Sequence, residues 1–178
     1  CQFCQTMDVV PAAGPIAGPS SVCTGQTITL SDPTTPGGTW TSSNPPTASV
    51  GLGTGIVTGG STFGSPVTIT YSLGTCTTTK LVTVNQSPAN IIGTTSVCVG
   101  LTTSLCDPTG PSGNFHWNSS DITKATFTTP GPCSTITGIA AGSPVISYIN
   151  NATLCFAVVT VNVTNSVAAI TGPNSVCM

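Results

Sequence analysis

Charge is almost absent from this sequence. Its 178 residues include no Glu and no Arg, and the complete charged set is four Asp and two Lys. An average soluble domain carries about 25% charged residues. A nucleic-acid or phosphate binder needs clustered Lys or Arg, so the composition excludes nucleic acid as a partner. A solvated helical bundle needs Glu, Lys and Arg on its outer faces, so that class is excluded as well.

Long apolar runs and signal-peptide features are also missing. No apolar run approaches the roughly 18 residues that a membrane-spanning helix needs, so we expect no membrane span in this segment. The first residues, Cys1-Gln2-Phe3-Cys4, have neither the basic region nor the apolar core of a signal peptide. Disorder of the charged, weakly apolar kind is disfavoured, because 38% of the residues are hydrophobic and the net charge is only -2.

Small residues and cysteine take the place of charge. The chain has 34 Thr, 20 Ser, 20 Gly and 15 Pro, which together make up half of it. It also has nine cysteines. Disulfides persist in oxidising compartments and help small domains to stay folded, so this cysteine content indicates an extracellular location, on a cell surface or secreted.

The sequence repeats itself. The motif Ser-Val-Cys at 21–23 recurs at 96–98 and again at 175–177. Each repeat therefore has an early cysteine, Cys23 or Cys98, and a late cysteine, Cys76 or Cys155. Each late cysteine precedes the next early one by 22 residues, and Cys1 precedes Cys23 by the same spacing. Residue 1 therefore falls at the late position of a preceding repeat.

The spacing of the cysteines predicts four segments. Residues 1–13 are the last strand of a preceding repeat, 14–89 are repeat 1, 90–167 are repeat 2, and 168–178 are the first strand of a following repeat. We interpret the chain as a window on a longer array, in which the neighbouring repeats of the same chain are partners. An independent two-domain protein with short tails is the alternative.

Hydrophobic residues alternate with a period of two within each repeat. Val67, Ile69 and Tyr71 alternate with Thr and Ser, so one face is apolar and the other carries hydroxyl groups. Gly and Pro clusters at 33–38 and 108–113 separate the strands as turns. About seven short strands per repeat are typical of an antiparallel sandwich of two sheets. The sequence therefore predicts an all-β fold of tandem sandwich domains.

Both repeats contain a further set of matched motifs. In repeat 1 these are Trp40, Ser42-Ser43-Asn44, Ala48, Val50, Gly55-Ile56-Val57-Thr58-Gly59, Val67, Ile69 and Tyr71. In repeat 2 they are Trp117, Ser119-Ser120, Ile136-Thr137-Gly138 and the segment 145–148. These motifs resemble those of the bacterial immunoglobulin-like domain of group 2. The early Ser-Val-Cys and the late cysteine are similar to the disulfide-bearing version found in giant surface proteins of Bacteroidetes. The resemblance implies an immunoglobulin-like β-sandwich in an extracellular stalk, adhesin or fibre, without catalytic residues or cofactors.

Within this resemblance the cysteines are expected to form disulfides inside each repeat. Because they occupy the same places, we expect Cys23 to pair with Cys76 and Cys98 to pair with Cys155. Two further cysteines occur only in repeat 2, at positions matching Ser31 and Thr54, and predict an additional disulfide there: Cys106 with Cys133.

Three cysteines remain without a predicted partner inside the two repeats. Cys1 and Cys177 are expected to bond within the neighbouring repeats. Cys4 has three alternatives: a bridge peculiar to the preceding repeat, a bond to Cys1, or an intermolecular link. A zinc site at Cys1-x-x-Cys4 is disfavoured, because the sequence has no second Cys-x-x-Cys and a single histidine.

The remaining chemically notable residues have structural interpretations. His116 adjoins Trp117 on a predicted strand, so alternation places it on the outer, solvent face and not beside a nucleophile. Asp32 and Asp107 each precede a proline and are typical of turns. The aromatic residues at matched positions are predicted to lie in the two cores: Trp40, Tyr71, Trp117 and Tyr148. We therefore expect no enzyme, no metal site and no cofactor.

The sequence favours a structural protein. Tandem sandwiches joined by short linkers predict a stiff extracellular stalk, adhesin or fibre, and the weakly charged surface favours assembly of identical chains into a filament. The alternative is an adhesive module whose loops at the domain ends recognise a glycan or a surface protein. No aromatic or charged cluster in the loops supports that alternative, so it ranks second.

Overall fold

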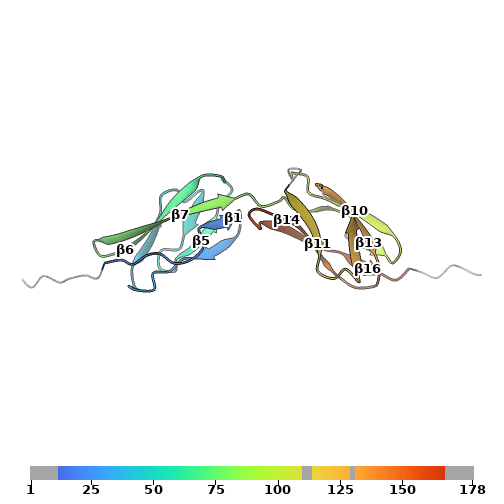
Figure 1. Ribbon diagram of the computed structural model, residues 1–178, viewed down its shortest axis with the longest axis horizontal. Helices are drawn as coiled ribbons and strands as arrows, with labels where there is room; N and C mark the ends of the chain where they lie inside the picture. The colour runs from blue at the N-terminus through green and yellow to red at the C-terminus, as the bar shows by residue number, and fades with distance from the viewer. Residues whose placement is uncertain (1–11, 110–113, 129–130, 167–178) are drawn as a thin grey trace, which may run out of the picture. The chain divides into compact units, whose positions relative to one another are not determined.

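The structure is a computed structural model that describes residues 12–109, 114–128 and 131–166. These residues form strands and turns, and no helix occurs among them. The chain divides into two compact units, Cys1–Ser87 (unit 1) and Pro88–Met178 (unit 2). The predicted strands of the neighbouring repeats fall outside the described residues, apart from residues 12 and 13. The all-β, immunoglobulin-like fold that the sequence predicts is confirmed for the described parts of both units (Figure 1).

Unit 1 is a sandwich of two sheets. One sheet has the strand order β1-β7-β6-β3 and the other has the order β2-β5-β4. Neighbouring strands are antiparallel except for β1, which runs parallel to β7 with Val22 beside Val84. A parallel pair needs a long connection, and here the rest of the unit supplies it. The bounds are β1 (Ser21–Cys23), β2 (Thr27–Thr29), β3 (Thr39–Ser42), β4 (Ala48–Val50), β5 (Ile56–Gly59), β6 (Pro66–Leu73) and β7 (Cys76–Asn85).

The core of unit 1 lies between the two sheets. Val67, Ile69 and Tyr71 on β6 are each at most 2% exposed, while the residues between them are half-buried. Trp40 on β3 packs against Tyr71, with ring centroids 4.7 Å apart and the ring planes tilted by 48°. The outer positions of β6 are mainly Thr and Ser, whose hydroxyl groups meet water without charge. The alternation in the sequence thus directs one side of each strand into the core.

Unit 2 repeats this arrangement. Its described strands form sheets of order β12-β13-β10-β8 and β11-β14-β15, and β9 pairs in parallel with β16, as β1 does with β7. Trp117 pairs with Tyr148 in the register that joins Trp40 to Tyr71. The bounds are β8 (Ile92–Gly93), β9 (Ser96–Cys98), β10 (Thr102–Cys106), β11 (Phe115–Ser119), β12 (Ala125–Thr128), β13 (Cys133–Gly138), β14 (Val145–Asn150), β15 (Phe156–Thr160) and β16 (Asn162–Thr164).

Unit 2 has a core of its own. Tyr148 is fully buried and lies between Phe115 and Trp117, with ring centroids 5.0 and 4.7 Å away. The two core clusters share no residue. All four aromatic residues predicted to lie in the cores are therefore buried there.

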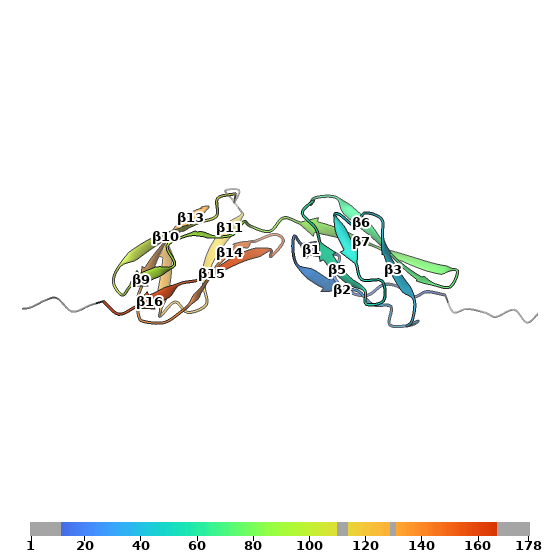
Figure 2. The ribbon, with the colours of Figure 1, turned by 180° about the vertical axis from the view of Figure 1, so that it is seen from behind.

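The last long strand of unit 1 runs the length of that unit. β7 starts at Cys76, directly after the turn that follows Leu73, and ends at Asn85, two residues before the unit boundary. Figure 2 shows the β6–β7 turn at one end of unit 1 and β1 at the other. Unit 1 thus has two ends, one at the start of β7 with Cys76 and the other at the end of β7, where Asn85 pairs with Cys23.

Candidate functional site

A buried carboxylate organises the N-terminal end of unit 1. Asp32 is 7% exposed, and Gly14 donates its backbone N–H to this carboxylate at 2.8 Å. Thr34 and Thr35 each donate a backbone N–H and a hydroxyl group to it, at 2.6 to 3.1 Å. These donors, the hydroxyl of Thr34 foremost, hold the pKa of Asp32 well below its usual value, although burial opposes the shift. The carboxylate thereby ties the first described segment to the loop before β3.

Asp107 has the same role in unit 2. It is 2% exposed and accepts the backbone N–H of Ala89 at 3.1 Å and that of Thr109 at 2.9 Å. The sequence predicts the turn, since Asp side chains accept from a residue two positions ahead. It does not predict the bond to the segment 18 residues earlier, because no local pattern signals that contact.

Tyr71 joins the core to the same loop of unit 1. Its ring lies in the core, and its hydroxyl accepts the backbone N–H of Gly38 at 2.8 Å. The hydroxyl also donates to the carbonyl oxygen of Thr35. The aromatic core and the carboxylate of Asp32 therefore fix one loop from two sides.

The predicted Cys106–Cys133 disulfide is present in the structure. These cysteines face each other across β10 and β13. In unit 1, Leu30 donates its backbone N–H to the carbonyl oxygen of Gly55, so Ser31 and Thr54 lie at the corresponding positions. Unit 2 thus has a covalent bond where unit 1 has two hydroxyl groups.

The predicted pairings of Cys23 with Cys76 and of Cys98 with Cys155 are wrong. Cys76 and Cys98 are free thiols, whereas Cys23 and Cys155 are disulfide-bonded. Cys23 pairs with Asn85 at the end of β7, and Cys76 is the first residue of that strand. Nine residues of strand separate the two places, which is about 30 Å. A disulfide needs Cα atoms within about 7 Å, so the early and late cysteines of this unit do not meet.

The same geometry holds in unit 2. Cys98 pairs with Thr164 at the end of β16, and Cys155 directly precedes β15. Nine residues again separate Cys155 from Thr164, or about 30 Å if the chain stays extended. The pairing was predicted from the position of each cysteine in the repeat, and the length of the last strand was not considered. Cys1, Cys4 and Cys177 lie outside the described residues.

His116 lies on the outer face of β11, as alternation predicts. It is exposed, and its Nδ1 is 2.5 Å from Oδ1 of the exposed Asn151. Trp117, the next residue, points into the core. Within the described residues, no three or more His, Cys, Asp or Glu side chains gather in a group able to hold a metal ion.

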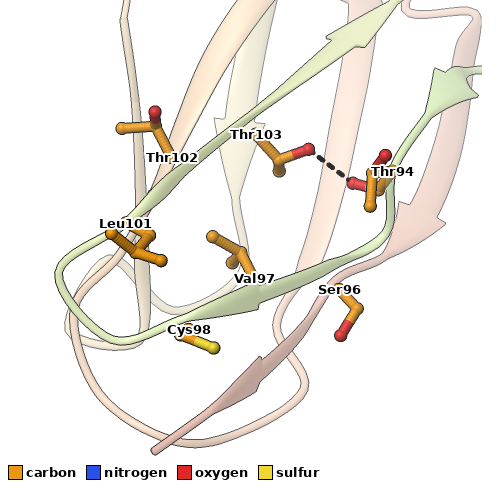
Figure 3. Close-up of a pocket in the computed structure, with 7 residues that line it drawn as sticks. All are labelled: Thr94, Ser96, Val97, Cys98, Leu101, Thr102 and Thr103. Carbon is orange, nitrogen blue, oxygen red and sulfur yellow. Dashed lines mark hydrogen bonds between the residues drawn. The ribbon is translucent and has the colours of Figure 1, made fainter. Parts of the chain in front are cut away.

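A cavity lies beside Cys98 at the C-terminal end of unit 2. Figure 3 shows Cys98 and Leu101 at the turn between β9 and β10. The Cys98 sulfur is 3.6 Å from the hydroxyl oxygen of Thr164. The cavity has a volume of about 300 Å³ and is lined by Thr94, Ser96, Val97, Cys98, Leu101, Thr102 and Thr103. Its lining is aliphatic and hydroxyl-bearing, apart from the one thiol.

Comparison with known proteins gives solved structures only. No protein family and no curated protein matches the chain. Domains 1–6 of the surface layer protein SbsC are 26% identical over 74% of this chain and 20% of theirs, with a TM-score of 0.33. The S-layer protein rSbsC(31-844) is 25% identical over 78% of this chain and 23% of its own, with a TM-score of 0.32. Human protocadherin-24 EC1-2 is 12% identical over 86% of this chain and 98% of its own, with a TM-score of 0.34.

The chain spans about a fifth of the length of the two larger surface-layer structures it matches. The fold assignment follows from the strand order and registers within each unit.

Proposed function

We propose that the chain is a stretch of a long repetitive extracellular protein and that its role is mechanical. It extends a stalk, adhesin shaft or fibre away from a cell surface and resists proteolysis. The observation that carries the proposal is the repetition of one fold in one register, each time around a separate core. A protein built from units that each bury their own core gains length by adding units.

The chemistry of the units supports an extracellular location. Cys106 and Cys133 form a disulfide, and Cys23 and Cys155 are also disulfide-bonded. Disulfides are rare where glutathione keeps thiols reduced. The part of the chain that the structure describes has no helix of the length and apolarity needed to cross a membrane.

We assign the units to the group 2 type of bacterial immunoglobulin-like domain, in the disulfide-bearing form of Bacteroidetes surface proteins. The positions that carry this resemblance are structural ones. Trp40 and Trp117 stand at matched places and pack on Tyr71 and Tyr148. Gly59, the last residue of the motif at 55–59, lies against the carbonyl of Cys23, where a side chain would collide.

An adhesive role is the second candidate. The cavity of about 300 Å³ beside Cys98 favours it by its size, because ligand pockets start near that volume. Its lining has no aromatic side chain on which a sugar ring stacks and no charged group. A second cavity, beside Asp32 and Tyr71, is smaller, at about 180 Å³. The mechanical role therefore has the stronger support.

Assembly of identical chains into a filament is a further part of the proposal. The chain has six charged residues, so little electrostatic repulsion opposes lateral contact. On the outer face of β15, Phe156 and Val158 are more than half exposed. Exposed apolar groups on a strand at a sheet edge favour association.

The full-length reading frame and the native cell surface test the proposal together. We expect many further units with the early and late cysteines on both sides of this segment. Immunogold electron microscopy with an antibody to unit 1 should label extended surface structures. A reading frame with only these two units, or label confined to the interior of cells, would contradict the mechanical role.

A further inference from the structure

The early and late cysteines of one unit do not bond to each other. The early and late positions of a unit are both cysteines, yet they lie about 30 Å apart along the last strand. Cys23 and Cys155 are disulfide-bonded, which shows that both kinds of position form disulfides. Their counterparts, Cys98 and Cys76, are free and only partly buried. The two free thiols therefore stand at positions that are bonded in the other unit.

The early cysteine lies at the C-terminal end of a unit. Cys23 pairs with Asn85, the last residue of β7. Cys98 pairs with Thr164, the last residue of β16. Any unit that follows in the chain must begin close to this end.

The late cysteine lies at the N-terminal end of a unit. Cys76 pairs with Leu73 across the β6–β7 turn, and the adjacent Ser72 pairs with Thr39. Thr39 follows the loop of Asp32, which holds the first described segment through Gly14. In unit 2, Cys155 accepts the backbone N–H of Asn150 at its carbonyl oxygen.

Unit 2 closes its N-terminal end in the same way. Asn150 pairs with Phe115, at the start of β11. The loop before β11 begins at Asp107, which holds Ala89 near the start of the unit. Any unit that precedes in the chain must therefore end close to the late cysteine.

From this placement we propose that successive repeats of the full-length protein are joined covalently, early cysteine to late cysteine of the next. Cys98 forms a disulfide with the late cysteine of the repeat that follows unit 2. Cys76 forms one with the early cysteine of the repeat that precedes unit 1. This inference rests on the proposed function, because it requires neighbouring repeats.

Chain connectivity makes this partner better placed than a cysteine of another molecule. Six residues separate β7 from β8, and a fully extended segment of that length spans about 20 Å. A linker of similar length after unit 2 would hold the N-terminal end of the next repeat near Cys98 at high effective concentration. Cys98 is only partly buried, so an approaching hairpin can reach it.

Each bond forms by a two-electron oxidation. Two thiols lose two protons and two electrons and become one disulfide. The oxidant is the disulfide of an extracytoplasmic thiol oxidoreductase, which is reduced to a dithiol. The exchange passes through a mixed disulfide, so the Cys98 thiolate attacks the oxidant and the incoming late cysteine displaces it.

The test compares two proteins: the full-length protein isolated from its native cell envelope, and the 178-residue chain expressed in an oxidising compartment. Both are denatured in N-ethylmaleimide without reductant, digested and mapped by mass spectrometry. In the 178-residue chain we expect Cys76 and Cys98 to be alkylated, with Cys106 linked to Cys133 as the internal control. In the full-length protein we expect neither Cys76 nor Cys98 to be alkylated. The Cys98 peptide should be linked to a late-cysteine peptide of the following repeat, and the Cys76 peptide to an early-cysteine peptide of the preceding one.

Three outcomes separate this inference from the function on which it rests. If flanking repeats exist but Cys76 and Cys98 are alkylated, the covalent joint is refuted and the mechanical role stands. If the linked peptides join two molecules, seen as a dimer on a non-reducing gel that reduction converts to monomer, the joint between successive repeats is refuted. If the reading frame contains no further repeats, both proposals fail.

Discussion

At the scale of the residue, Tyr71 connects two kinds of stabilisation. Its ring fills the core beside Trp40, and its hydroxyl bonds the backbone of the loop at Thr35 and Gly38. A buried polar group that loses its partner costs more than the bond itself contributed. The same tyrosine therefore holds the loop at the N-terminal end of unit 1 and fills part of the core.

We predict that Tyr71→Phe destabilises unit 1 by about 1–3 kcal/mol, because it leaves the Gly38 N–H and the Thr35 carbonyl without this partner. The ring stays in place, so packing is preserved. Urea denaturation of the variant measures the change. Thr79→Ala, at an exposed position of β7, is the control and should change the unfolding free energy by at most about 0.5 kcal/mol. Equal effects of the two substitutions would show that the hydroxyl contributes nothing specific.

A disulfide distinguishes unit 2 from unit 1. Cys106 and Cys133 are 27 residues apart, and closing a loop of that size stabilises a domain by about 3–4 kcal/mol on the chain-entropy estimate. The double variant Cys106→Ser, Cys133→Thr copies the residues of unit 1 and should lose about that much. Thermal unfolding with and without dithiothreitol provides the measurement. Reductant should lower the transition of unit 2 more in the wild-type chain than in the variant, because the variant lacks the Cys106–Cys133 disulfide and keeps only the bond of Cys155. A variant as stable as the wild type would show that the disulfide does not stabilise unit 2.

At the scale of the element, the carboxylate of Asp32 joins a segment and a loop that are distant in sequence. Its pKa is held below the ordinary value by the Thr34 hydroxyl and the other donors. In the window between the folded and unfolded pKa values, the unfolded chain binds more protons than the folded chain. Stability therefore rises with pH through that window, is complete above the unfolded pKa of about 3.9, and is lost as pH falls toward the folded pKa.

We predict that the wild-type chain loses this part of its stability on acidification and that Asp32→Asn does not. The difference in urea midpoint between the two proteins should be constant from pH 7 to about pH 5 and should shrink as pH falls below about 4. Taking the difference removes contributions of the other carboxylates, which both proteins share. Parallel pH profiles down to pH 2 would show that protonation of Asp32 does not cause the loss of stability at low pH.

The elements themselves were largely predictable from the sequence. Alternation at 67–71 places Val67, Ile69 and Tyr71 on one face, and the structure buries those three. The fold class and the face of each aromatic residue followed from the same periodicity. The parallel pairing of β1 with β7 did not, because strand alternation is the same for both directions.

The candidate site was less predictable from the sequence, because its contacts depend on distances that residue spacing does not give. Cys106 and Cys133 are direct cross-strand neighbours, so equivalence with Ser31 and Thr54 was sufficient to pair them. Cys23 and Cys76 share a repeat but lie at opposite ends of a ten-residue strand, and position in a repeat does not encode distance. The bond from Gly14 to Asp32 depends on how the chain enters the unit, which no local motif records.

At the scale of the whole molecule, the separation of the two cores determines whether unfolding of one unit destabilises the other. The core around Trp40 and the core around Trp117 have no residue in common. In repeat proteins stability is approximately a sum of unit terms and nearest-neighbour terms. A chain whose core interactions are confined to each unit therefore loses one unit at a time, as the proposed mechanical role requires.

We predict that Trp40→Ala destabilises unit 1 by about 3–5 kcal/mol, the usual cost of removing a buried tryptophan, and leaves the core of unit 2 protected. Hydrogen exchange with mass spectrometry resolves the two units in one experiment, because peptides from β6 and from β14 report on different cores. Exchange should accelerate in β6 alone. The reciprocal variant Trp117→Ala is the matched control, and it should accelerate exchange in β14 alone. If either substitution exposes both cores to the same degree, the units fold as one cooperative body. Length would then not be gained by adding independent units, and the mechanical role would lose the feature on which it depends.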